Sequence, residues 1–218
     1  MVKKSFAILG LGVFGTELAK KLRKDGHYVL VVDINHSKIE AIKDKVSEAI
    51  IADVSNENVI KELEIAKFDT VFLGMSNFFE KAILAMTLLT QEKAKYVIAK
   101  AQNDIQKQIL EKLGADEVIQ PDIDMAFRLS RRLSMPHIED MFEFKGSSIA
   151  TVTVKEDMNN RSIRDIDFRK RFNITVVLYR SKDSLDAHPV WDPDIILLEG
   201  DELTVIGREE DIMKAFNG

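Results

Sequence analysis

The sequence predicts an α/β protein in which a doubly wound parallel sheet is followed by a connecting helix and a small α+β domain. Three observations lead to this prediction. Apolar runs of strand length alternate with amphipathic helical segments in the first half, and three glycines follow the first run. Short strands separated by turns replace this alternation in the last third. We therefore expect domains at residues 1–121 and 141–218, joined by a helix and linker at residues 122–140.

Six strands and five helices account for the first domain. The first predicted helix has one apolar face, formed by Phe14, Leu18 and Leu22. The predicted strands are residues 6–9, 28–32, 48–52, 70–73, 96–99 and 117–119. The predicted helices are residues 14–24, 36–44, 57–63, 79–90 and 104–113. Such an alternation is typical of a parallel sheet with helices on both faces.

The first strand leads into a glycine-rich turn, GLGVFG, at residues 10–15. This turn places backbone N–H groups and the positive end of a helix dipole where a pyrophosphate can bind. We assign Gly10 to the sharp turn, Gly12 to close approach of the backbone to phosphate, and Gly15 to packing of helix on strand. The second strand ends at Asp33, where a carboxylate can bind a ribose hydroxyl. Together these features predict a Rossmann-like nucleotide-binding domain. The alternative is a strand-to-helix turn without a ligand.

Polar residues follow three further strands, at the edge where open α/β sheets bind ligands. Asp53 follows the third strand and is placed to contact adenine or ribose, or else, like Ser55, to cap the next helix. Ser76 belongs to a group of small and polar residues after the fourth strand. Lys100 ends the fifth strand and is either a phosphate ligand or a solvated lysine.

Residues 123–133 are predicted to form a connecting helix that ends before Pro136. Met125, Leu129 and Leu133 make an apolar stripe along it, which requires a partner, either the first domain or another copy of the chain. A second stripe, interpreted as a solvated face rather than a phosphate site, consists of Arg128, Arg131 and Arg132.

The small domain is predicted from shorter segments. Its expected strands are residues 148–154, 174–179, 195–198 and 203–206. Its expected helices are residues 163–172 and 209–216, with polar turns at 181–186 and 199–201. A domain of this size is near the lower limit for independent stability, which favours pairing with a second copy.

Composition and missing motifs exclude several classes of function. Without cysteine the chain has no disulfides, thiolate metal sites or thiol redox chemistry. The formal net charge of −5 argues against broad nucleic-acid binding, and no 18-residue apolar window predicts membrane insertion. No Walker lysine motif, nucleophile elbow or histidine dyad is present. The chain is therefore predicted to hold a nucleotide without transforming it, and not to be an enzyme. The alternative is a small NAD(P)-dependent oxidoreductase.

Several segments resemble the RCK domain, also called KTN, and in particular the soluble regulatory subunits of bacterial Ktr and Trk potassium-uptake systems. They are GLGVFG, VVDIN at 31–35, Ala52-Asp53, VIAKAQND at 97–104 and EKLGADEVIQPDIDMA at 111–126. The resemblance covers nearly the whole chain, because the segment from Met141 onward is similar to the smaller C-terminal RCK domain.

The resemblance implies a homodimer that assembles into an octameric ring at the cytoplasmic face of the cell membrane. There it would bind an integral-membrane potassium-translocating subunit. Adenine nucleotides, ATP and ADP or NADH and NAD, would bind the first domain and change the shape of the ring. The helix after Pro121 would be the crossover helix exchanged within the dimer. A regulator of a different cation transporter or exporter is the alternative within this family.

The resemblance also assigns residues. The implied nucleotide-binding positions are Gly10, Gly12, Val13, Phe14, Gly15, Asp33, Asn35, Asp53, Ser76 and Lys100. Val13 stands where relatives often carry an arginine that reaches a terminal phosphate, which leaves discrimination of ATP from ADP open. Asp122 stands where relatives carry a glutamate associated with a divalent cation, Mg or Ca.

The small domain of some relatives binds cyclic di-AMP at its dimer interface. The matching residues here are Arg169, Phe172, Asn173, Ile174, His188 and Pro189. In this interpretation Arg169 supplies charge, Phe172 stacks and Ile174 forms an apolar floor. The alternative is that Phe172 and Ile174 are core residues and Arg169 is solvated.

Overall fold

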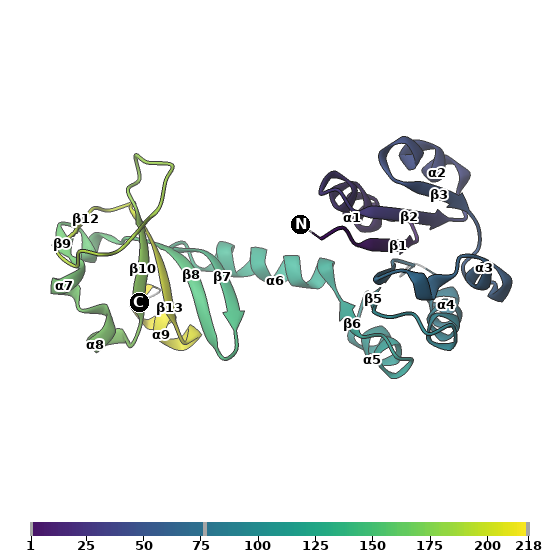
Figure 1. Ribbon diagram of the computed structural model, residues 1–218. Coiled ribbons are helices and arrows are strands. Elements are labelled where there is room, and N and C mark those ends of the chain that lie inside the picture. Colours follow the sequence, from purple (N-terminus) through teal and green to yellow (C-terminus); the bar gives the residue numbers. More distant parts are fainter. Residues whose placement is uncertain (1, 76–77, 217–218) are drawn as a thin grey trace. The chain divides into compact units, whose positions relative to one another are not determined.

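The computed structural model describes residues 2–75 and 78–216. The chain divides into two units, Met1–Ile123 and Asp124–Gly218, each with its own sheet and core (Figure 1). The predicted fold class is confirmed, with a Rossmann-like parallel sheet in the first unit and a small α+β arrangement in the second. The predicted domain boundaries stay predictions.

The first unit alternates strand and helix as predicted. Its strands are β1 (Ser5–Leu9), β2 (Tyr28–Asp33), β3 (Glu48–Ile51), β4 (Thr70–Leu73), β5 (Val97–Lys100) and β6 (Glu117–Ile119). Its α-helices are α1 (Val13–Lys24), α2 (His36–Ile42), α3 (Glu57–Glu62), α4 (Phe79–Gln91) and α5 (Asp104–Lys112). Short 3₁₀ helices lie at η1 (Lys43–Lys45) and η2 (Ile65–Lys67). All six strands are parallel, in the order β3-β2-β1-β4-β5-β6.

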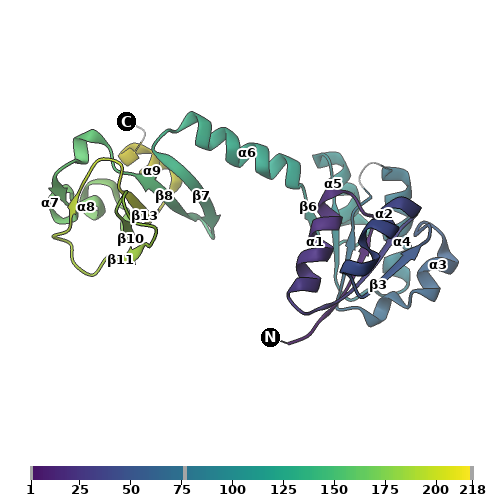
Figure 2. The ribbon, with the colours of Figure 1, turned by 90° about the horizontal axis from the view of Figure 1, so that it is seen from above.

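The two faces of this sheet carry separate cores. Successive strand residues point to opposite faces, so Ala7 and Leu9 belong to one core and Ile8 to the other. Helices α3, α4 and α5 cover the first face, and α1 and α2 cover the second (Figure 2). Because the chain winds away from β1 in both directions, a ligand crevice is expected at the carboxyl ends of the strands near β1 and β4.

Helix α6 (Pro121–Ser134) follows the sheet, and the structure leaves all 14 of its residues at least partly exposed. The arginine stripe is not only a solvated face, because two of its members form ion pairs. Arg128 contacts Asp140 at 2.8 Å and Arg131 contacts Glu209 at 3.0 Å. Over the described part of the chain, no helix combines the length and apolar composition that a membrane crossing requires.

The second unit is built on an antiparallel sheet in the order β11-β10-β13-β8-β7, with a separate β12-β9 pair. Its strands are β7 (Ile138–Phe144), β8 (Ser147–Thr153), β9 (Arg161–Ser162), β10 (Thr175–Arg180), β11 (His188–Pro189), β12 (Ile196–Leu197) and β13 (Glu202–Gly207). Its helices are η3 (Glu156–Met158), α7 (Ile163–Ile166), α8 (Phe168–Phe172) and α9 (Glu209–Phe216). Phe216 of α9 stacks on Phe168 of α8 in the core, with ring centroids 5.9 Å apart.

The prediction of one helix over residues 163–172 is wrong. Asp167 adopts a left-handed conformation with φ of 52° and separates α7 from α8. Its carboxylate accepts a hydrogen bond from the backbone N–H of Lys170, so that it caps α8. Ser162 and Asp165 form a capping box at the start of α7. These local hydrogen bonds stabilise two short helices where apolar periodicity alone indicates one.

The sequence did not predict strand β7. Its sequence, IEDMFEF, contains three acidic residues, which are disfavoured in strands. An irregular register between Ile138 and Asp140 also breaks the alternation of apolar and polar residues. Pairing with β8 nevertheless forms this edge of the sheet, where Ile138 lies opposite Val152 and both side chains are buried.

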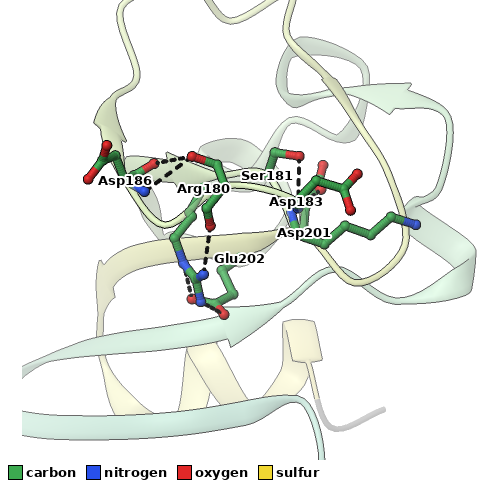
Figure 3. Close-up of polar contacts among 8 residues, drawn as sticks. Arg180, Ser181, Asp183, Asp186, Asp201 and Glu202 are labelled. Carbon is green, nitrogen blue, oxygen red and sulfur yellow. Dashed lines mark hydrogen bonds and ion pairs between the residues drawn. The ribbon is translucent and has the colours of Figure 1, made fainter.

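A buried carboxylate organises the turn before β13 (Figure 3). Asp201 has 0% of its surface exposed and accepts hydrogen bonds from the Tyr179 hydroxyl at 3.0 Å and from two backbone N–H groups. Those two groups belong to Lys182, at 3.0 Å, and Leu198, at 2.9 Å. Beside it, Arg180 of β10 forms a two-point ion pair with Glu202 across the sheet.

Candidate nucleotide-binding site

One cleft of about 790 Å³ opens at the carboxyl ends of the parallel strands of the first unit. Its lining includes nine of the ten predicted nucleotide-binding positions, together with the predicted metal ligand Asp122. The nine are Gly10, Gly12, Val13, Phe14, Gly15, Asp33, Asn35, Asp53 and Lys100. Ser76 lies outside the described residues, although its neighbours Gly74 and Met75 line the same cleft. Residues at or just after the ends of all six parallel strands thus line this cleft.

The three glycines differ in what surrounds them. Gly10 has a φ of +99°, and a Cβ there would lie 3.0 Å from Met75. A Cβ on Gly15 would lie 2.5 Å from the backbone oxygen of Gly10, closer than real side chains approach. A Cβ on Gly12 would meet no protein atom within 4 Å. Gly10 and Gly15 are therefore required by the fold, whereas Gly12 leaves open space on the cleft side of the turn.

Helix α1 begins immediately after Gly12, and no side chain caps it. The N–H groups of its first turn have no partner within the helix, and the helix dipole adds positive potential there. Its first turn carries no acidic residue. Phe14 packs against Phe72 below the turn, with ring centroids 5.4 Å apart, whereas Val13 is exposed. This end of the cleft favours an anionic ligand group.

Asp33 lies at the end of β2, and only 9% of its surface is exposed. Its carboxylate accepts backbone hydrogen bonds from Leu11 at 2.6 Å and from Asn35 at 2.8 Å. The first bond fixes the carboxylate against the glycine turn. A carboxylate has about four acceptor positions, so these bonds orient Asp33 and leave acceptor capacity for hydroxyl groups. Asn35 caps α2 through its side-chain oxygen, which accepts from Ser37.

Asp53 is not the cap of α3, because Asn56 occupies that position. The Asp53 carboxylate instead accepts hydrogen bonds from Ser55 at 2.6 Å and from the ammonium of Lys81 at 2.5 Å. Lys81 belongs to α4 and also lines the cleft. The hydrogen bond from Lys81, followed by those from Ser55, lowers the pKa of Asp53 from 3.8 to about 2.

This lowered pKa predicts a pH dependence of stability. Because the folded-state pKa of Asp53 lies below its ordinary value of 3.8, the ionised form stabilises the fold above about pH 4, and this contribution disappears as the pH falls toward 2. We expect Lys81→Met to lower the free energy of unfolding at pH 6 and to have a smaller effect at pH 3. Urea unfolding at both pH values measures the difference. An effect of Lys81→Met that is equal at pH 6 and pH 3 contradicts the assignment.

Lys100 at the end of β5 forms an ion pair with Asp122, with 2.8 Å between ammonium and carboxylate. The side chain of Lys100 is 17% exposed, so Lys100 is not a freely solvated lysine. Asp122 is the second residue of α6, and its side chain is 80% exposed. Within residues 2–75 and 78–216, no three His, Cys, Asp or Glu side chains are grouped to hold a metal ion. Asp122 is a single carboxylate engaged with a lysine and does not by itself fit a cation site.

Sequence reasoning missed two lysines of the cleft, Lys38 and Lys81. Lys38 of α2 lies 3.4 Å from Asp33, and Lys81 reaches Asp53 from a helix 28 residues further along the chain. Both look like ordinary surface lysines of amphipathic helices. Only the packing of α2 and α4 beside the strand ends shows that they face the cleft.

The residues predicted to bind a second ligand in the small domain lie in several environments. Ile174 is buried in the core, and Phe172 packs against it in part. Arg169 is exposed on α8, and Asn173 follows that helix in a left-handed conformation. His188 and Pro189 are exposed in β11 and pair with β10. Cyclic di-AMP binding stays a prediction.

Comparison with known proteins now identifies the family. Residues 6–121 match the model of the TrkA-N domain, and residues 149–217 match that of the TrkA-C domain. This chain belongs to the RCK family. The resemblance to the RCK family seen in the sequence is therefore confirmed, and it extends to both the N-terminal and the C-terminal domain.

Several relatives of the RCK chain are named as potassium uptake proteins. It is 30% identical to Ktr system potassium uptake protein A of Bacillus subtilis (strain 168), over 98% of this chain and 96% of that protein. It is also 30% identical to Ktr system potassium uptake protein A of Vibrio alginolyticus, over 95% of this chain and 94% of that one. Among solved structures, the GsuK channel bound to NAD matches with a TM-score of 0.67 and 16% identity, over 100% of this chain and 40% of that one. The comparison with GsuK shows that the two proteins share a fold.

Proposed function

We propose that this RCK chain is a nucleotide-sensing regulatory subunit that gates a membrane potassium transporter or channel. The observation that carries the proposal is that the glycine turn, Asp33, Asp53 and Lys100 line one cleft. The relatives named as Ktr potassium uptake proteins support the biological setting, because they align along nearly their whole length.

The ligand we propose is an adenine nucleotide, ATP or ADP, or NAD or NADH. Its ribose hydroxyls would donate to Asp33, and its adenine amino group or ribose would donate to Asp53. The phosphates would lie on the N–H groups at the start of α1, next to the space left open by Gly12. The carboxylates of the cleft, Asp33, Asp53 and Asp122, are each paired with a lysine, which suits ligand binding rather than proton transfer.

The partners we propose are a second copy of the chain and an integral-membrane potassium-translocating subunit. Met125, Leu129 and Leu133 of α6 are exposed in the single chain, and a dimer would bury this stripe. Such dimers would assemble into an octameric ring, peripheral at the cytoplasmic face of the membrane. A ligand can shift this ring between two shapes only by binding one more tightly than the other.

Binding to the purified chain tests the proposal. Titration calorimetry with ATP, ADP, NAD and NADH should show saturable binding of at least one of them, with one site per chain. Light scattering with and without that nucleotide should show an assembly larger than a monomer and a change in its size or shape. If none of the four nucleotides binds, the proposed function is wrong. Steady consumption of NADH with a metabolite would indicate an oxidoreductase instead.

A further inference from the structure

Three lysine–aspartate pairs line the cleft, and one differs from the other two in which partner is covered. In the Asp33–Lys38 and Asp53–Lys81 pairs the carboxylate is the less exposed partner. In the third pair the order is reversed, since the Lys100 side chain is 17% exposed and the Asp122 side chain is 80% exposed. The fixed charge at the β5 end of the cleft is therefore positive, and its counter-ion is the side chain that water reaches.

Because of this reversal, separating the pair costs more free energy at Lys100 than at Asp122. A lysine whose side chain is largely covered is less well hydrated than an exposed one, so leaving its charge without a counter-ion is costly. An exposed carboxylate loses little when it turns away, because water solvates it fully. Lys100 consequently favours any anion that can take the place of Asp122, and releasing Asp122 costs little.

The cleft directs a ligand's phosphates toward this pair. Asp33 and Asp53, at the ends of β2 and β3, offer acceptors to ribose and adenine on one side of β1. Lys100, at the end of β5, lies on the other side, beyond β4. A nucleotide whose adenosine lies over β2 and β3 therefore extends its phosphates across the glycine turn toward Lys100.

We propose that Asp122 competes with the ligand. Its carboxylate occupies the position beside Lys100 that a ligand phosphate would take, and a bound nucleotide displaces it. This inference rests on the proposed function and specifies how the site is regulated. It gives Asp122 a role different from the divalent-cation ligand that the resemblance implies. It also connects the phosphate end of the cleft to α6, because Asp122 is the second residue of that helix.

The test is Asp122→Asn, measured by titration calorimetry with ADP in the presence of a chelator. Removing the competing charge should lower the dissociation constant for ADP by about three- to tenfold. Adenosine, which has no phosphate, should bind the variant and the unmodified chain equally. Asp25→Asn is the matched control, because Asp25 is paired with Lys21 at the far end of α1 and does not line the cleft. That control should leave ADP binding unchanged.

A double-mutant cycle identifies the lysine involved. Lys100→Met should weaken ADP binding, and in that background Asp122→Asn should no longer tighten it. Unchanged or weaker ADP binding by Asp122→Asn overturns the inference while the proposed function stands. Binding that depends on Mg²⁺ in the unmodified chain and loses this dependence in Asp122→Asn shows a metal ligand instead. If the unmodified chain binds none of the four nucleotides, the proposed function fails and this inference fails with it.

Discussion

Replacing Gly12 with valine is expected to weaken adenine-nucleotide binding strongly while leaving the first unit folded. Gly12 has φ and ψ of −71° and 178°, an extended conformation that valine adopts readily. A Cβ at this position meets no protein atom within 4 Å, so the valine methyl groups would enter the cleft and not the core. We expect the dissociation constant for the bound nucleotide to rise by at least about tenfold, which corresponds to about 1.4 kcal/mol.

Gly15→Ala is the matched control for Gly12→Val. Its Cβ would lie 2.5 Å from the Gly10 oxygen, so we expect a loss of about 1–3 kcal/mol in the free energy of unfolding. Gly12→Val should show no such loss in urea unfolding. The pair therefore separates a steric block of the ligand from damage to the fold. Unaltered nucleotide affinity in Gly12→Val would show that the ligand does not approach the turn at Gly12.

Asp201→Ala is expected to have the largest effect on the stability of the second unit. The Asp201 carboxylate is fully buried and accepts from Tyr179, Lys182 and Leu198. Alanine would leave these three donors without their acceptor in a covered site. We expect a loss of about 3 kcal/mol, which lowers the melting temperature of a unit of this size by more than about 10 °C.

The control for Asp201→Ala lies in the same region of the second unit. Asp183 is an exposed aspartate, so Asp183→Ala removes the same charge without uncovering buried donors. Its effect should stay within about 0.5 kcal/mol. Thermal unfolding followed by circular dichroism measures both variants. Equal melting temperatures for the two variants would contradict the prediction, because the buried hydrogen bonds of Asp201 would then contribute no more to stability than an exposed charge does.

The pH dependence assigned to Asp53 and the competition assigned to Asp122 concern opposite sides of the same cleft. Asp53 is held by Lys81 and Ser55, which keeps its pKa low and its carboxylate charged at neutral pH. Asp122 is exposed and forms an ion pair with Lys100. We therefore expect changes at Asp53 to alter stability and adenosine recognition together, and changes at Asp122 to alter phosphate recognition alone.

The sequence by itself determined the parallel sheet, the glycine turn and the positions of Asp33, Asp53 and Lys100. These features are local, because strand periodicity, a positive φ at Gly10 and the end of each strand are set by neighbouring residues. Since parallel strands all end at the same edge, sequence positions after several strands could be assigned to one site before any contact was known.

Only the tertiary structure decided which groups these residues contact. The partner of Asp53 is on α4 and the partner of Lys100 is on α6. Two of the donors to Asp201, Tyr179 and Lys182, lie 22 and 19 residues away in the sequence. No local pattern specifies such pairs, because an ion pair between distant segments depends on how helices pack beside strand ends. The same holds for β7, whose acidic sequence is disfavoured in isolation and becomes a strand through its pairing with β8.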